Sequence, residues 1–135
     1  MEVHVARLEG VKFEVQARGH RVMCDQPVEN AGTDAGLSPP EFLLASLGTC
    51  AMYYAAEYLR VRGLPAEELQ VRVAAEKAAH PARLSSFRID VLAPGLEARH
   101  QEGVSRAVKK CLIHNTLLEP RAIETSVVST VPVCV

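Results

Sequence analysis

The residues of this sequence best suited to chemistry are its four cysteines, Cys24, Cys50, Cys111 and Cys134. No two of them form a C-x-x-C pair, so neither a zinc ribbon nor a thioredoxin-type motif is predicted. In a reducing compartment, a cysteine is either a small buried hydrophobic residue or a reactive thiol. Burial alone would account for any one of the four, and position alone does not decide which pair would react.

Other catalytic and ligand-binding motifs are absent from the sequence. A metal site built from Cys50, Cys111 and His114 is conceivable, but this spacing matches no established ligand pattern, so we predict no metal. The sequence holds no G-x-S-x-G, phosphate loop, H-E-x-x-H or EF-hand pattern, and we therefore predict no bound cofactor. Glu41 is fully explained as the carboxylate that caps a helix.

Length and composition predict one globular domain spanning residues 1–135, of which 48% are hydrophobic and 23% charged. Lys and Arg number 15 and Asp and Glu 16, for a net charge of -1. Such a balance, with three Tyr, three Phe and no Trp, predicts neither a nucleic-acid partner nor a membrane partner. The start, MEVHVARLEG, lacks the basic and apolar regions of a signal peptide, so we predict a cytoplasmic protein.

The strongest local signal is the capping box Ser38-Pro39-Pro40-Glu41, which predicts a helix running to Arg62. Residues 42–59 are apolar on nearly every face, and such a helix must be covered on all sides. A domain of this size has little material to wrap so long a helix. We therefore infer that a second subunit supplies part of the cover, most simply in a two-fold dimer.

Period-2 alternation of apolar residues predicts three short antiparallel strands before Asp25 and two more strands joined near His80-Pro81. The spacing of Val104, Ala107, Val108, Cys111 and Leu112 predicts an amphipathic helix. A terminal strand is predicted over residues 121–133. The order βββ-α-ββ-α-β indicates an α+β fold in which antiparallel sheets pack around a long buried central helix.

Two segments carry a resemblance to a known family. The run LSPPEFLLASLGTC, residues 37–50, closely resembles the central-helix signature of the OsmC/Ohr superfamily. The run KCLIH, residues 110–114, looks like the second cysteine segment of that family, near the start of a short helix. The strands and the His80-Pro81 hinge also fall in the right order, so the resemblance covers essentially the whole chain.

This resemblance implies an intertwined homodimer that acts as a thiol-dependent peroxidase on organic hydroperoxides, in defence against oxidative stress. Cys50 would be the peroxidatic thiolate, which becomes a sulfenic acid. Cys111 would be the resolving thiol, and the disulfide between them would be reopened by an external dithiol, a thiol or lipoyl-type reductant. Cys24 and Cys134 would be bystanders.

A thiol in the middle of a helix gains nothing from the helix N-terminus, so we expect burial to raise its pKa unless a cation lies nearby. In the family, an arginine of the N-terminal hairpin, held by the glutamate at the helix start, is that cation. The matching residues are Glu41 and Arg18, with Arg21 as the alternate.

The hairpin QARGHR, residues 16–21, does not reproduce the family's Gly-Gly-Arg-Asp-Gly turn, and the helix lacks the aromatic-rich start of typical peroxidases. The chain therefore looks like a divergent, OsmC-like branch of the superfamily. The alternative function is a non-catalytic protein whose apolar pocket beside Cys50 binds a small hydrophobic ligand.

Overall fold

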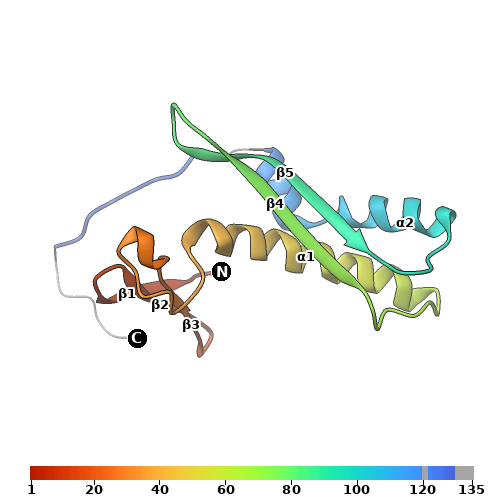
Figure 1. Ribbon diagram of the computed structural model, residues 1–135, viewed down its shortest axis with the longest axis horizontal. Helices are drawn as coiled ribbons and strands as arrows, with labels where there is room; N and C mark the ends of the chain where they lie inside the picture. The colour runs from red at the N-terminus through yellow and green to blue at the C-terminus, as the bar shows by residue number, and fades with distance from the viewer. Residues whose placement is uncertain (120–121, 130–135) are drawn as a thin grey trace.

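A computed structural model describes residues 1–119 and 122–129 (Figure 1). The elements follow one another as β1 (His4–Glu9), β2 (Lys12–Ala17), β3 (His20–Cys24), the 3-10 helix η1 (Val28–Asn30), α1 (Pro39–Val61), β4 (Gln70–Ala78), β5 (Arg83–Leu92), α2 (Ala98–Val108) and α3 (Leu112–Leu118). The predicted α+β class, with antiparallel sheets and a long helix, is confirmed.

The first sheet has the order β1-β2-β3, and both pairings are antiparallel. Its second hairpin closes on a two-residue turn, Arg18-Gly19, in which both residues have positive φ, as the tightest hairpin turns require. After β3, the buried carboxylate of Asp25 accepts hydrogen bonds from the backbone N–H groups of Gln26, Thr33 and Ala35. These bonds hold the loop that leads from the sheet into α1.

Helix α1 begins where the capping box predicted. The Glu41 carboxylate accepts hydrogen bonds from the hydroxyl of Ser38 at 2.6 Å and from its backbone N–H at 3.4 Å. The helix ends at Val61, and Gly63 follows in the left-handed conformation that commonly closes a helix. The local signals of this segment were therefore sufficient to predict its bounds to within a residue or so.

One stripe of α1 is buried by its own chain, namely Leu47, Ala51, Ala55 and Leu59. The antiparallel hairpin β4–β5 crosses α1 on one side, and α2 lies beside its C-terminal half (Figure 1). Val104 and Val108 of α2 complete the core together with Ile89 and Val91 of β5. This arrangement makes α1 the axis on which the second half of the chain is assembled.

The single helix predicted around Val104–Leu112 is wrong, because the chain forms two helices there. Helix α2 ends at Val108, and Cys111 is the N-cap of α3, where its Sγ accepts a hydrogen bond from the His114 backbone N–H at 3.4 Å. Side chains that bond to nearby backbone N–H groups favour a helix start over a helix interior. The apolar spacing continues across the break because both helices pack against α1.

The last predicted strand is also wrong for the residues that can be described. Residues 122–129 form no strand, and Ile123, Val127 and Val128 are exposed. Val131, which belongs to the same prediction, lies outside the described residues, and so does the predicted bystander Cys134. An extended segment becomes a strand only when a sheet edge pairs with it, and 122–129 has no such partner within the described chain.

In the described residues, none of the helices is both long enough and apolar enough to span a bilayer.

Gly103 sets how closely α2 approaches α1, because a Cβ at this position would overlap the phenol of Tyr58. We expect Gly103→Ala to lower the free energy of unfolding by about 1–3 kcal/mol, the usual cost of overpacking, although alanine is the better helix former. Urea unfolding measures the change. The control Ser105→Ala lies on the exposed face of the same helix and should leave stability within about 0.5 kcal/mol. A Gly103→Ala protein at least as stable as wild type would contradict this packing.

Candidate active site

Helices α1 and α3 bring the two predicted redox cysteines together. Cys50 lies midway along α1, Cys111 lies at the N-cap of α3, and their side chains are hydrogen-bonded to each other. Both are free thiols. Cys111 has no solvent exposure, whereas Cys50 is half-buried. A molecule arriving from solvent can therefore meet the sulfur of Cys50 but not that of Cys111.

The surroundings of the two thiols shift their pKa values in opposite directions. Burial raises the pKa of Cys50, but hydrogen bonds from the Cys111 side chain and from the backbone N–H groups of Ile113 and Leu112 more than offset it, so the pKa lies below the ordinary value. Burial also raises the pKa of Cys111, and so does its hydrogen bond to Cys50. The site therefore favours the thiolate form at Cys50 over that at Cys111, which donates a hydrogen bond to it.

The expectation that burial raises the pKa of Cys50 in the absence of a cation is wrong. Its thiolate form is favoured by backbone N–H groups in the first turn of a second helix, those of Leu112 and Ile113, and the Ile113 N–H also bonds to Cys111. Neither Leu112 nor Ile113 was identified from the sequence as a contributor. The signal available was the run KCLIH at the start of a short helix, which places these N–H groups next to Cys111.

The other predicted site residues are not brought to Cys50 by this chain. Arg18 lies exposed in the β2–β3 turn, Arg21 forms an ion pair with Glu14 at 3.8 Å, and Glu41 caps α1. In Figure 1 the three-stranded sheet lies beyond the N-terminal end of α1, whereas α3 lies over its middle. The activating role of Arg18 or Arg21, held by Glu41, stays a prediction.

His114, the third residue of the conceivable metal site, lies close to Cys111, because its backbone N–H bonds to the Cys111 sulfur. It is half-buried, and its Nδ1 atom is buried without a hydrogen-bond partner in the described chain. Its neighbourhood does not make a metal site, because no group of three or more His, Cys, Asp or Glu side chains suited to a metal occurs among residues 1–119 and 122–129. His114 and the two cysteines are therefore neighbours without forming a ligand set.

An open cavity of about 480 Å³ lies between α1 and α3, near the thiol pair, although Cys50 itself does not line it. Tyr54, one helical turn after Cys50, and Leu112, whose N–H bonds to the Cys50 sulfur, both line it. Lys110, Asn115 and Thr116 contribute polar groups to the same wall. The cavity is thus mixed in character.

The Cys111 thiol is expected to lower the pKa of Cys50 as a hydrogen-bond donor. In a Cys24→Ser, Cys134→Ser background, Cys111→Ala should shift the pH profile of Cys50 alkylation by iodoacetamide to higher pH, because the thiolate loses one donor. Cys111→Ser is the matched control, since its hydroxyl still donates and the profile should move less. Superimposable profiles for all three proteins would contradict the assigned hydrogen bond.

Comparisons with known proteins support the fold described above. A family model described as OsmC-like protein matches residues 32–126. No curated protein matched the sequence. Among solved structures, a candidate osmotic stress induced and detoxification response protein from Psychrobacter arcticus has a TM-score of 0.77 at 20% identity, covering 84% of this chain and 85% of its own.

Two further structures share the fold at similarly low identity. An OsmC-like protein from Mycoplasma pneumoniae has a TM-score of 0.72 at 19% identity and covers 87% of this chain and 86% of its own. An organic hydroperoxide resistance protein from Legionella pneumophila has a TM-score of 0.60 at 18% identity, with 87% and 89% covered. These likenesses establish the fold. The residues matched by the family model include both Cys50 and Cys111.

Proposed function

This chain belongs to the OsmC-like protein family, and from that premise we propose that it is a thiol-dependent peroxidase that reduces organic hydroperoxides through Cys50 and Cys111. The observation that carries the proposal is the hydrogen-bonded thiol pair. Its two pKa values shift in opposite directions: the pKa of half-buried Cys50 is lowered and the pKa of buried Cys111 is raised. A nucleophile and a protected second thiol are the two parts that a dithiol peroxidase requires. A solved relative of the same fold is named for organic hydroperoxide resistance.

In the first step, the Cys50 thiolate attacks the terminal oxygen of the hydroperoxide. A sulfur–oxygen bond forms as the O–O bond breaks, so Cys50 becomes a sulfenic acid and the substrate is reduced. The departing alkoxide takes a proton from solvent and leaves as the alcohol. The backbone N–H groups of Leu112 and Ile113 stabilise the thiolate form of this sulfur.

In the second step, Cys111 loses its proton and attacks the sulfur of the Cys50 sulfenic acid. The sulfur–sulfur bond forms as the S–O bond breaks, and the hydroxide takes the proton and leaves as water. An external dithiol then reduces the disulfide by exchange and is itself oxidised to a disulfide. Such a cycle suits the cytoplasm, where thiols are kept reduced and where we place the protein.

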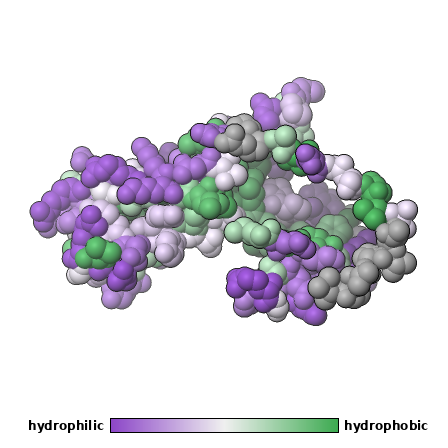
Figure 2. Space-filling view, turned by 180° about the vertical axis from the view of Figure 1, so that it is seen from behind, coloured by the Kyte–Doolittle hydropathy of each residue, from purple (hydrophilic) through white to green (hydrophobic). Residues whose placement is uncertain are grey.

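The proposed enzyme is a homodimer. The described part of the chain leaves the outward face of α1 uncovered, and Leu43, Tyr53 and Val61 are exposed on it. Figure 2, seen from behind the view of Figure 1, shows apolar side chains near the middle of the molecule. A second copy related by two-fold symmetry would cover this face, and its N-terminal hairpin is the element that could bring Arg18 or Arg21 to Cys50.

A stopped-flow assay with cumene hydroperoxide tests the proposed reaction. The reduced protein should consume the peroxide faster than background and lose two thiols per turnover, because Cys50 and Cys111 enter one disulfide. Mass spectrometry of the oxidised protein should assign that disulfide to these two residues. No loss of thiols under limiting peroxide would reject the enzyme and favour the non-catalytic, ligand-binding alternative.

A further inference from the structure

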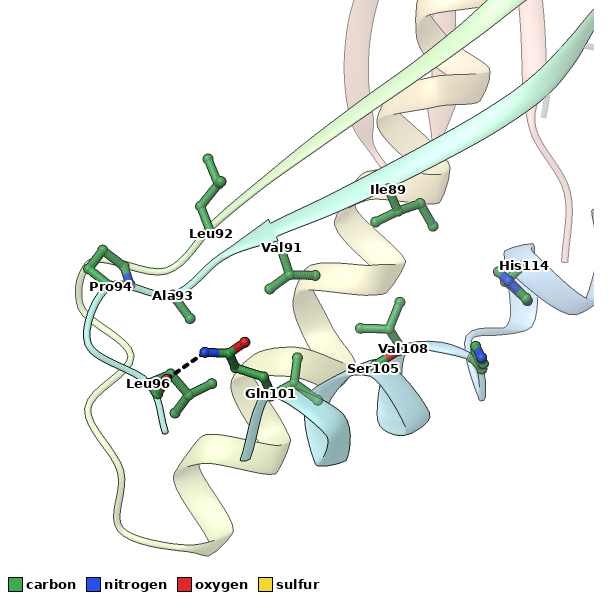
Figure 3. A pocket seen from close by; sticks show the side chains of 12 residues that line it. Ile89, Val91, Leu92, Ala93, Pro94, Leu96, Gln101, Ser105, Val108 and His114 are labelled. Atoms are coloured by element: carbon green, nitrogen blue, oxygen red, sulfur yellow. Dashed lines mark hydrogen bonds between the residues drawn. The ribbon is translucent and has the colours of Figure 1, made fainter. Parts of the chain in front are cut away.

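A second cavity, of about 610 Å³, opens between β5 and α2 and is separate from the thiol pair (Figure 3). Its lining consists of Ile89, Val91, Leu92, Ala93, Pro94, Leu96, Gln101, Val104, Ser105, Val108, Lys109 and His114. Neither Cys50 nor Cys111 belongs to this lining. Its volume lies within the range of about 300–1,000 Å³ that is typical of small-molecule sites.

The floor of the cavity is apolar and is part of the packed core. Val104 and Val108 are buried there, and Ile89, Val91 and Leu96 pack against the same cluster. Side chains held in a close-packed core keep their positions, so the cavity cannot close by a simple change of rotamer. An apolar molecule of matching size would find this surface already formed.

The polar groups of the cavity differ in whether they already have an interaction partner. Gln101 uses its amide to donate to the Leu96 carbonyl at 2.7 Å, as the dashed line in Figure 3 shows. His114 lies at the other end of the view, and its buried Nδ1 has no hydrogen-bond partner in the described chain. Lys109 directly follows Val108 and forms no ion pair with the described residues.

The lining contains no acidic side chain, so the charge of Lys109 is not balanced within the cavity. A buried polar atom such as His114 Nδ1 is usually hydrogen-bonded in a folded protein, and one without a partner calls for an explanation. A carboxylate would balance the charge of Lys109 and give His114 Nδ1 a partner, because its two oxygens can accept hydrogen bonds from an ammonium and from an imidazole N–H at once.

We propose that the cavity between β5 and α2 binds a small apolar monocarboxylic acid. The hydrocarbon body lies on the floor formed by Ile89, Val91 and Val108. The carboxylate accepts hydrogen bonds from the Lys109 ammonium and from the Nδ1–H tautomer of His114. This site does not depend on the proposed peroxidase function, since the sulfur of Cys50 takes no part in it.

Isothermal titration calorimetry of the full-length protein with octanoate tests this site, with 1-octanol as the uncharged probe of equal chain length. Octanoate should bind saturably with one site per chain, at least about tenfold more tightly than 1-octanol. Cys50→Ser should bind octanoate like the wild type. That variant separates this proposal from the peroxidase, because it removes the proposed reaction and leaves the cavity intact.

Three further variants locate the site. Ser105→Trp places a large side chain at an exposed position of the lining and should abolish binding, while thermal unfolding checks that the protein still folds. Lys109→Gln should weaken octanoate binding about tenfold and leave 1-octanol unchanged. Lys110→Gln is the matched control, because it removes the same charge from the neighbouring residue, which does not line this cavity.

Several results would overturn the proposal. These are the absence of saturable octanoate binding, undiminished binding by Ser105→Trp, and equal weakening by Lys109→Gln and Lys110→Gln. A second copy of the chain seated in the cavity would also prevent binding and would overturn it. Equal affinity for octanoate and 1-octanol would remove the assigned role of the carboxylate.

Discussion

Peroxide consumption by the Cys50→Ser protein is expected to fall by at least about 10³-fold relative to wild type, to the background rate. A serine hydroxyl is not ionised near neutral pH, so neither the N–H groups of Leu112 and Ile113 nor the Cys111 thiol can make it a comparable nucleophile. Stopped-flow measurement with cumene hydroperoxide gives the rate constants of both proteins. Circular dichroism verifies that the variant, which replaces one atom at a half-buried position, retains its fold.

Two other cysteine variants make this result specific. Cys24→Ser should keep the wild-type rate, because Cys24 is buried at the end of β3 and both burial and the charge of Asp25 raise its pKa. Cys111→Ser should perform one turnover and then stop as a Cys50 sulfenic acid, which dimedone labels. A Cys50→Ser protein with appreciable activity would reject the assigned nucleophile, and continued turnover by Cys111→Ser would reject the resolving role.

The parts of this fold that follow from local signals could be predicted from the sequence. The hydroxyl and carboxylate of Ser38 and Glu41 start α1, and Gly63 closes it, because these effects act within one turn of helix. The β4–β5 hairpin likewise joins neighbouring segments, so alternation of apolar residues with a turn at His80-Pro81 was enough.

The arrangement of the site could not be predicted from the residues alone. The apolar spacing from Val104 to Leu112 fits one helix, and only the tertiary structure shows that the chain breaks at Cys111. That break has a chemical consequence, because it frees the N–H groups of Leu112 and Ile113 to bond to Cys50. Nearly every residue type has a backbone N–H group, so the sequence does not show which of these groups will bond to a side chain. For this reason a cationic side chain was expected to stabilise the Cys50 thiolate.

The failure of the last predicted strand has a different cause. The alternation of Ile123, Val127 and Val128 describes a side-chain pattern, whereas a strand also needs a neighbouring edge. Within residues 1–119 and 122–129 no edge pairs with this segment. The exposed face of α1 has the same character, since both surfaces are apolar and lack a partner among the residues that the structure describes. Both therefore support the proposed homodimer.

The second large effect is expected on stability. Oxidation of Cys50 and Cys111 to a disulfide should raise the free energy of unfolding by about 4 kcal/mol. The bond closes a loop of about 60 residues, and the loss of chain entropy in the unfolded state gives this value. Unfolding in guanidinium chloride with and without a dithiol reductant measures the difference, at protein concentrations held equal because dimerisation also contributes to stability.

The Cys111→Ser protein is the control, since it has both Cys24 and Cys50 but cannot form this disulfide, and peroxide should give it no gain in stability. The gain in wild type requires that α3 keeps its place on α1 after oxidation, because a bond that displaced the helix would remove packing and offset the entropic term. An oxidised protein that carries the Cys50–Cys111 disulfide but is no more stable than the reduced form would contradict this expectation. It would mean that formation of the disulfide displaces α3, and that α3 packs on α1 in this way only when both cysteines are reduced.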